Sequence, residues 1–160
     1  DVYKRHVKSY MDDLNQNGVY EISSDLLEKI QDVFKAGWLN EDEVLDTIKT
    51  CFEQTGYLLD THTAIGYGVY KEYQKTSGDE TKTIILATAS PYKFADSVYK
   101  ALTDQSLSEY QAIEAVYEKT GVDIPKPLVQ LDQKEILHQK VIDKDDIIHE
   151  ISQKIKEMSL

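Results

Sequence analysis

Two short segments of the sequence hold the residues whose types and spacing could support catalysis or ligand binding. In the first, Asp60 and His62 flank Thr61 at a loop-to-helix junction, and Thr63 follows. An aspartate two residues from a histidine suggests an acid–base pair. The structural alternative is a capped helix start, with Thr61 or Thr63 as the capping residue. No serine or cysteine nucleophile is marked beside the pair, which argues against a hydrolase triad.

The second segment, residues 84–94, has the pattern of a strand followed by a helix. Residues 83–88 form a short run that is β-branched and apolar on both faces, which predicts a buried strand of a parallel sheet at about 82–88. Ligands of open α/β sheets bind beyond the carboxyl ends of the strands, and helix starts suit phosphate. Thr88, at the end of the strand, could therefore face a cofactor or substrate. Alternatively, Thr88 only ends the strand, and Ser90 only caps the helix that begins near Pro91.

Helical periodicity dominates the rest of the chain. Asn40 with Glu43, and Ser106 with Glu109, match the capping-box pattern of helix starts. A last helix is expected from about Asp145. Its inward-facing residues would be Ile147, Ile148, Ile151 and Ile155. The sequence therefore predicts a predominantly helical α/β fold with one clear strand at about 82–88.

Three glycines and the single cysteine have distinct expected roles. Gly37 is expected to end the second helix. Gly66 and Gly68 fall inside a predicted helix, where each costs about 1 kcal/mol relative to Ala, so both should permit close packing against another backbone or a ligand. Cys51 falls on an apolar helical face, which favours packing over catalysis. A lone cysteine cannot form an internal disulfide, which fits a reducing cytoplasm.

Length and charge narrow the classes of function. The chain has 160 residues, which suits one domain, and a formal net charge of −11. That balance argues against binding to nucleic acid and to an anionic membrane surface. Four scattered histidines make a metal site improbable. They are His6, His62, His138 and His149.

The lone strand is unusual for a self-sufficient α/β domain, because a buried strand needs neighbours on both edges. Its partner strands are therefore expected to lie in sequence outside this chain. An exposed sheet edge and apolar face would also promote self-association of the isolated piece.

Both segments resemble the threonine synthase family. Residues 56–66, Gly-Tyr-Leu-Leu-Asp-Thr-His-Thr-Ala-Ile-Gly, are similar to its signature of glycine-tyrosine, an acid, usually proline, then histidine-threonine-alanine. Residues 86–94, Leu-Ala-Thr-Ala-Ser-Pro-Tyr-Lys-Phe, resemble its later threonine-alanine-histidine-proline segment, which ends in lysine-phenylalanine. The chain departs from the family at Thr61, where proline is common, and at Ser90, where many members have histidine. The similarity covers nearly the whole chain, and both motifs occur in order at the expected spacing.

This resemblance implies the carboxy-terminal portion, residues 1–160, of a fold type II pyridoxal phosphate enzyme that converts O-phospho-L-homoserine and water to L-threonine and phosphate. It implies that Thr88 faces the pyridine nitrogen of the cofactor. Asp60, His62 and Thr63 would border the substrate side, where Lys93 would help attract the substrate phosphate. The lysine that forms the Schiff base with the cofactor would lie upstream, so the chain alone is expected to be inactive.

Two alternatives remain open. A threonine-synthase-like phospho-lyase would eliminate phosphate without adding water, and these segments do not separate it from a synthase. An acidic helical module that binds a protein partner would instead need a self-contained fold, without a deficit of partner strands.

Overall fold

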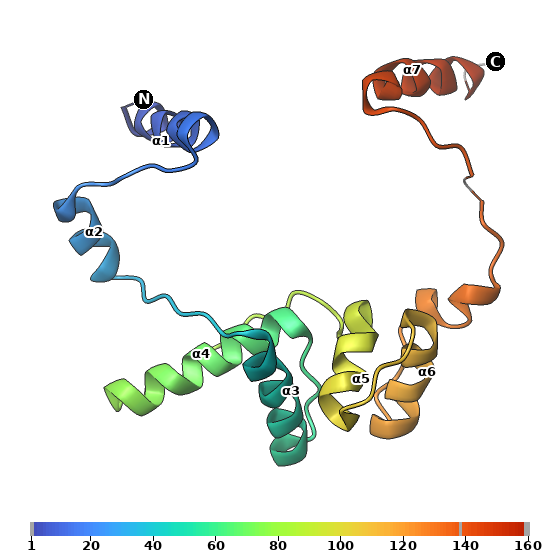
Figure 1. Ribbon diagram of the computed structural model, residues 1–160, viewed down its shortest axis with the longest axis horizontal. Helices are drawn as coiled ribbons and strands as arrows, with labels where there is room; N and C mark the ends of the chain where they lie inside the picture. The colour runs from blue at the N-terminus through green and yellow to red at the C-terminus, as the bar shows by residue number, and fades with distance from the viewer. Residues whose placement is uncertain (1, 138, 159–160) are drawn as a thin grey trace.

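The computed structural model describes residues 2–137 and 139–158 and is predominantly helical in that range. The described residues form seven α-helices, α1 (Val2–Asn17), α2 (Ser24–Gln31), α3 (Glu41–Thr55), α4 (Thr61–Ser77), α5 (Ala95–Thr103), α6 (Glu109–Thr120) and α7 (Ile147–Met158), and four short 3₁₀ helices, η1 (Pro91–Phe94), η2 (Lys126–Leu128), η3 (Leu131–Gln133) and η4 (Lys144–Asp146). Helices α3 to α6 form one body, and α1, α2 and α7 lie on two arms that extend from it (Figure 1). We call these parts the body and the arms.

Helix α3 begins and ends where the sequence predicts. The Asn40 side chain accepts a hydrogen bond from the Glu43 N–H at 2.9 Å, and the Asn40 N–H donates to Glu43 Oε2 at 2.7 Å. This reciprocal pair is the expected capping box, and it satisfies two backbone N–H groups at the helix start. Gly56 ends the helix with a φ of 73°, a conformation that glycine adopts without strain.

The capping box predicted at Ser106 and Glu109 is wrong. Helix α6 begins two residues later, and the Ser108 N–H and hydroxyl both donate to Gln111 Oε1. Leu107 packs against the core immediately before this cap. An apolar residue in that position fixes where the chain enters the helix, so core packing selected the second serine over the first.

The hydrophobic core lies between the helices of the body. Ile48 of α3, Val98 of α5 and Val116 of α6 are its largest fully buried side chains. Helix α5 packs against both α3 and α6, while α4 packs against α3. Cys51 is buried in the same cluster, in agreement with the expected packing role.

The two glycines of α4 differ in their surroundings. A Cβ atom at Gly68 would lie 2.5 Å from Leu39 Cδ1 and 3.1 Å from Thr47 Oγ1, so close packing is confirmed there, although against side chains and not against the backbone or ligand that was expected. A Cβ atom at Gly66 would meet only Ile85 Cγ2, at 3.9 Å. Gly68 therefore allows the chain before α3 to lie against α4, whereas Gly66 is not crowded by the described residues.

Gly37 does not end the second helix. Helix α2 stops at Gln31, and Gly37 lies six residues beyond it, in the connection to α3. A Cβ atom at Gly37 would lie 2.6 Å from Val69 Cγ1, so this glycine is required for contact with α4. A glycine is needed at position 37 for the packing of the connection against α4, and not for the end of a helix.

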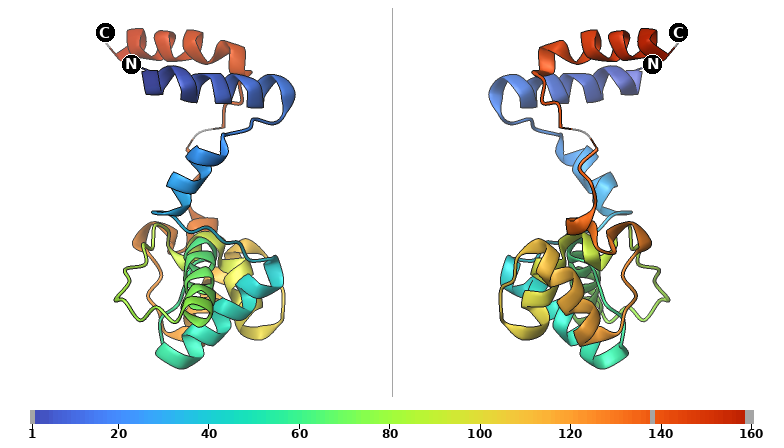
Figure 2. Two further views of the ribbon diagram at one scale, coloured as in Figure 1. Left: turned by 90° about the vertical axis from the view of Figure 1, so that its left-hand side faces the viewer. Right: turned by 90° about the vertical axis from the view of Figure 1, so that its right-hand side faces the viewer.

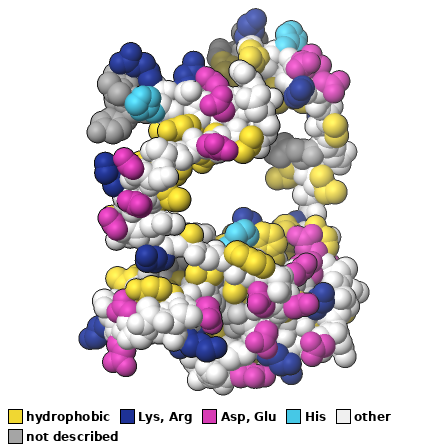
Figure 3. Space-filling view, turned by 60° about the vertical axis from the view of Figure 1, so that its left-hand side comes forward, with side chains coloured by type: hydrophobic (Ala, Val, Ile, Leu, Met, Phe, Trp, Pro, Cys, Tyr) yellow, Lys and Arg dark blue, Asp and Glu magenta, His cyan; other side chains and the backbone are white. Residues whose placement is uncertain are grey.

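The apolar faces of the arms are exposed. Ile148 is 80% exposed, and the other isoleucines expected to face inward from α7 are also on the surface. The same is true of Val7, Met11 and Leu14 on α1 and of Leu26, Leu27 and Ile30 on α2. Figure 2 shows the arms standing off the body in both side views, and Figure 3 shows apolar side chains bordering the opening between them. The inward orientation predicted for α7 is therefore wrong in this chain, because these isoleucines lie at the surface.

The strand predicted at 82–88 is not formed. Residues 79–89 run without regular secondary structure, and Ile84 and Leu86 are 87% and 77% exposed. The connection is held at its start by Asp79, which accepts hydrogen bonds from the Tyr73 hydroxyl and the Thr81 N–H, both at 2.9 Å. A strand forms only by pairing with another, and none of the described residues belongs to a strand.

None of the helices in the described ranges combines the length and apolar character that a bilayer crossing requires.

Candidate functional site

Asp60 is the structural anchor of the first segment. It is 2% exposed and is the N-cap residue of α4. Its Oδ1 accepts hydrogen bonds from the backbone N–H groups of His62, at 2.9 Å, and Thr63, at 3.2 Å, while Oδ2 accepts one from the Thr63 hydroxyl. The helix is therefore capped by Asp60, and the prediction that Thr61 or Thr63 caps it is wrong.

This cap also answers the question of an acid–base pair. The His62 Nδ1 atom lies 3.7 Å from Asp60 Oδ1, beyond hydrogen-bond distance. Both carboxylate oxygens are occupied by the helix start. In this structure Asp60 holds the backbone on which His62 stands, and the carboxylate does not hydrogen-bond to the imidazole.

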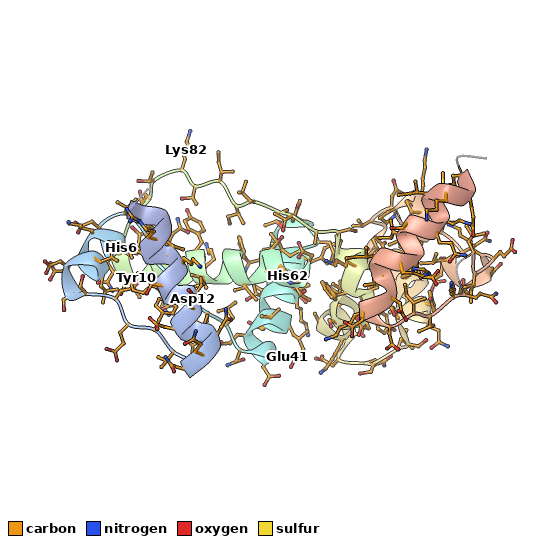
Figure 4. All side chains as sticks on the ribbon, turned by 90° about the horizontal axis from the view of Figure 1, so that it is seen from above. His6, Tyr10, Asp12, Glu41, His62 and Lys82 are labelled. Atoms are coloured by element: carbon orange, nitrogen blue, oxygen red, sulfur yellow. The ribbon has the colours of Figure 1, made fainter. Side chains whose placement is uncertain are left out.

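The His62 side chain is 62% exposed and packs against the second segment. Its ring centroid lies 5.3 Å from that of Phe94, with the planes tilted by 38°. The Lys93 ammonium lies 5.3 Å from the centroid of the same phenylalanine ring. Seen from above, His62 lies over the body, between α1 and α7 (Figure 4). Asp60, His62 and Thr63 thus lie together at the start of α4, and Lys93 is linked to them through the Phe94 ring. We call these four residues the His62 cluster.

The second segment is anchored to the body through Tyr92. Ser90 Oγ accepts a hydrogen bond from the Tyr92 N–H at 3.2 Å, so the predicted capping role of Ser90 is confirmed. The Tyr92 side chain is buried, and its hydroxyl donates to the Val122 carbonyl oxygen beyond the end of α6. Burial raises the pKa of the Tyr92 phenol above its ordinary value. These contacts fix the short helix that carries Lys93 and Phe94.

Thr88 does not join the His62 cluster. It lies exposed on the connection before Ser90 and makes no hydrogen bond with other described residues. Its expected position depended on a strand that would end beside the cluster. Because that strand is not formed, the described chain leaves Thr88 in solvent.

The residues of this chain do not by themselves fit a pyridoxal phosphate site. The hydroxyl expected to face the cofactor, on Thr88, is exposed, and the buried polar groups of the His62 cluster are satisfied by one another. The lysine side chains that the structure describes, from Lys8 onward, lie at the surface. The least accessible is that of Lys49, which is still 39% exposed. A cofactor would therefore need walls and a lysine that these residues do not supply.

One groove of the described surface lies away from this chemistry. It has a volume of about 1260 Å³ and lies between α3, α4 and the connection that carries Trp38. The five predicted site residues are not among those that line it. The candidate site therefore lies at the contact between the two segments and not in the groove.

A metal site is not formed by the described residues, which contain no group of three or more suitable ligands. His6, His62 and His149 are separate from one another along the described chain, and His138 lies outside the described residues.

Comparison with known proteins identifies the relatives of the chain. Residues 63–151 match the family model described as "Threonine synthase, C-terminal". Threonine synthase-like 1 of Mus musculus is 29% identical over 136 residues, which cover 81% of this chain and 18% of that protein. Threonine synthase of Schizosaccharomyces pombe is 31% identical over 98 residues, which cover 61% of this chain and 19% of that protein. The chain thus spans about a fifth of the length of these relatives.

Two solved structures are also similar. The PLP-bound threonine synthase of Brucella melitensis is 34% identical, with a TM-score of 0.52 over 68% of this chain and 23% of that one. The yeast threonine synthase is 23% identical, with a TM-score of 0.73 over 96% of this chain and 30% of that one. The second likeness concerns the fold alone, and it extends to the arms because it covers almost the whole chain.

Proposed function

We propose that this chain, which belongs to the threonine synthase family as its carboxy-terminal portion, supplies one wall of the active site of a full-length threonine synthase. The full-length enzyme converts O-phospho-L-homoserine and water to L-threonine and phosphate. The chain by itself does not catalyse this reaction, because the lysine that binds pyridoxal phosphate and the phosphate-binding loop come from the remainder of the enzyme.

One observation carries this proposal. The two segments that resemble the family lie about 30 residues apart in the sequence, and they meet where the His62 ring packs 5.3 Å from the Phe94 ring. Asp60 fixes one side of this contact through the start of α4, and Tyr92 fixes the other through the body. Residues that share a family signature and converge in space are better explained by a common ligand than by packing alone, since His62 and Lys93 are both exposed.

Each residue of the site then has a chemical task. The His62 imidazole can donate and accept hydrogen bonds, and the Lys93 ammonium supplies a positive charge toward the substrate phosphate. Thr63 and Asp60 hold the backbone that presents His62. In the full-length enzyme Thr88 would contribute its hydroxyl to the pyridoxal phosphate site, and the cofactor would supply the stabilisation of negative charge on the substrate.

The remainder of the enzyme is the partner that the exposed surface requires. Residues 82–88 pair with strands of that remainder and become the strand that the sequence predicts. The same pairing moves Thr88 from solvent to the end of a strand. The exposed apolar faces of α1, α2 and α7 pack on the same partner, and in its absence they promote self-association of the chain.

We further propose that the enzyme works in the cytoplasm, where its single cysteine in this segment stays reduced. A stand-alone interaction module explains the molecule less well, because such a module needs a self-contained fold, whereas α1, α2 and α7 lie on arms that stand off the body (Figure 1 and Figure 2).

The experiment that tests this function uses the full-length product of the gene, with the 160-residue chain as a control. Each protein is supplied with pyridoxal phosphate and O-phospho-L-homoserine, and phosphate and threonine are quantified together. We expect equal amounts of both products from the full-length protein and neither from the chain. Phosphate without threonine would establish a phospho-lyase instead. Neither product from a folded, cofactor-loaded protein would reject both reactions.

A further inference from the structure

Phe94 contacts both chemically active side chains of the His62 cluster. The His62 ring lies 5.3 Å from the Phe94 ring, tilted by 38°, and the Lys93 ammonium lies 5.3 Å from the centroid of the same ring. A tilted ring pair and a cation near an aromatic ring are both favourable arrangements. One aromatic side chain is therefore the common support of an imidazole and an ammonium group.

Neither of these two groups is restrained by burial. The His62 and Lys93 side chains are exposed, and the structure gives neither a hydrogen bond shorter than 3.4 Å within the described residues. In solvent such side chains exchange among several rotamers, and ordering them on a ligand costs entropy. The Phe94 ring is the described contact that limits both sets of rotamers.

The Phe94 ring is itself held on both sides. Tyr92, two residues earlier, is buried and bonded to the Val122 carbonyl oxygen, and Ala95, which begins α5, is fully buried. Phe94 is half-buried between these fixed points. Its position follows from the core of the body and does not depend on the exposed connection 79–89.

We propose that Phe94 is a positioning residue of the active site, which holds the His62 imidazole and the Lys93 ammonium toward the same anionic group of the substrate. This inference rests on the proposed function for its substrate, a phosphate monoester. Phe94 does not touch the reacting atoms and acts through the two side chains that pack against it. It is distinct from the groups that the sequence marks for chemistry, because phenylalanine has no hydrogen-bonding or titratable atom.

The contact is tested first in the 160-residue chain, by NMR of the histidine ring protons. An aromatic ring at this distance shifts the ring protons of His62, which are assigned by their loss in His62→Gln. We expect Phe94→Leu to move the His62 signals toward those of an exposed histidine and Phe94→Tyr to retain their position. Tyr110→Leu, a matched change of a half-exposed aromatic residue on α6, leaves the signals in place. Unchanged His62 signals in Phe94→Leu would overturn the inference.

The functional role is tested in the full-length enzyme by a double-mutant cycle. We expect Phe94→Leu to lower kcat/KM for O-phospho-L-homoserine about tenfold, and Phe94→Tyr to restore most of the loss. If Phe94 acts through its neighbours, the same change lowers kcat/KM less than about twofold in a His62→Gln, Lys93→Gln background. An equal loss in both backgrounds would show that Phe94 only supports the fold, and the inference would be wrong.

The two tests separate this inference from the proposed function. A full-length enzyme that forms no product from O-phospho-L-homoserine rejects the proposed function and, with it, the catalytic role of Phe94. The NMR result then still decides whether Phe94 holds His62. An active enzyme in which Phe94→Leu has no effect on kcat/KM leaves the proposed function intact and rejects the inference alone.

Discussion

The body and the arms are made of similar amphipathic helices, and they differ in what covers them. In the body, α3, α5 and α6 bury Ile48, Val98 and Val116 completely. In the arms, α1, α2 and α7 leave comparable apolar side chains in solvent, around the opening that Figure 3 shows. The comparison teaches that apolar spacing predicts a helix and its inner face, but it does not identify the element that covers that face.

The largest expected difference between the two regions concerns apolar truncation. Ile48→Ala should lower the free energy of unfolding by about 2–5 kcal/mol, because it leaves a cavity in a fully buried site. Ile148→Ala on α7 should change it by less than about 0.5 kcal/mol, because that side chain is already in solvent. Urea unfolding of the 160-residue chain at low concentration, followed by circular dichroism, measures both. Equal losses would show that α7 packs on a partner in solution, and the distinction between body and arms would fail.

Helix caps provide the second contrast. Asp60→Ala should cost about 2 kcal/mol, because it removes the acceptor for two backbone N–H groups and the Thr63 hydroxyl in a buried position. Asp60→Asn keeps one oxygen acceptor and should recover part of the loss. The matched change in an arm is Ser23→Ala, which removes an exposed cap bond of 3.4 Å to the Leu26 N–H. It should affect the unfolding of the body by less than about 0.5 kcal/mol in the same urea titration, and a loss as large as that of Asp60→Ala would contradict the contrast.

Most of the helices could be predicted from the sequence because their signals are local. The spacing of apolar residues and the pattern at Asn40 and Glu43 need no distant partner. The resemblance to the threonine synthase motifs indicates His62 and Lys93, and in the structure each of them packs against the Phe94 ring. The capping role of Asp60 was missed, although aspartate is among the preferred N-cap residues and directly precedes the helical run.

The strand predicted at 82–88 is not formed in this chain, since its formation depends on a second strand. Apolar β-branched residues indicate that a segment suits a sheet, but pairing is a property of two segments. The position expected for Thr88 depended on the same strand, and Thr88 is therefore exposed in this chain. Close packing of Gly37 on Val69 was likewise hidden, because it joins positions 32 residues apart through the fold.

The third contrast compares the crowded and the open faces of α4 within the body. Gly68→Ala should lower the free energy of unfolding by about 1 kcal/mol, because the added Cβ must displace Leu39 while Thr47 remains bonded to the Glu43 carbonyl oxygen. Gly66→Ala should raise it by about 0.5–1 kcal/mol, because alanine favours a helix interior and the site has room. Thermal unfolding of the two variants side by side gives the sign of each change. A loss of stability in Gly66→Ala would show that this face is already covered in the isolated chain.

The smallest expected effect is a change in the free energy of unfolding at alkaline pH. It tests how firmly the second segment is anchored to the body. Burial raises the pKa of Tyr92 above its ordinary value of 10.0. Below pH 10 the phenol keeps its proton in both the folded and the unfolded chain, so the free energy of unfolding does not depend on it. Above pH 10 the unfolded chain loses this proton first, and stability falls until the pH has passed the folded pKa.

Tyr92→Phe should remove this part of the alkaline loss, and it should cost about 1 kcal/mol at neutral pH through the missing bond to the Val122 carbonyl oxygen. Urea unfolding at intervals between pH 8 and pH 11 measures the difference in the free energy of unfolding between Tyr92→Phe and the parent chain. The titration of lysines is common to both proteins and cancels in this difference. Burial, with the nearby Cys51, also raises the pKa of Tyr67. A weaker fall of stability with rising pH should therefore persist in Tyr92→Phe, and it should disappear only when Tyr67→Phe is added. If Tyr92→Phe lost stability at alkaline pH as steeply as the parent chain, the Tyr92 hydroxyl would be exposed in solution. The anchor that holds Phe94 beneath His62 would then have to be sought elsewhere in the body.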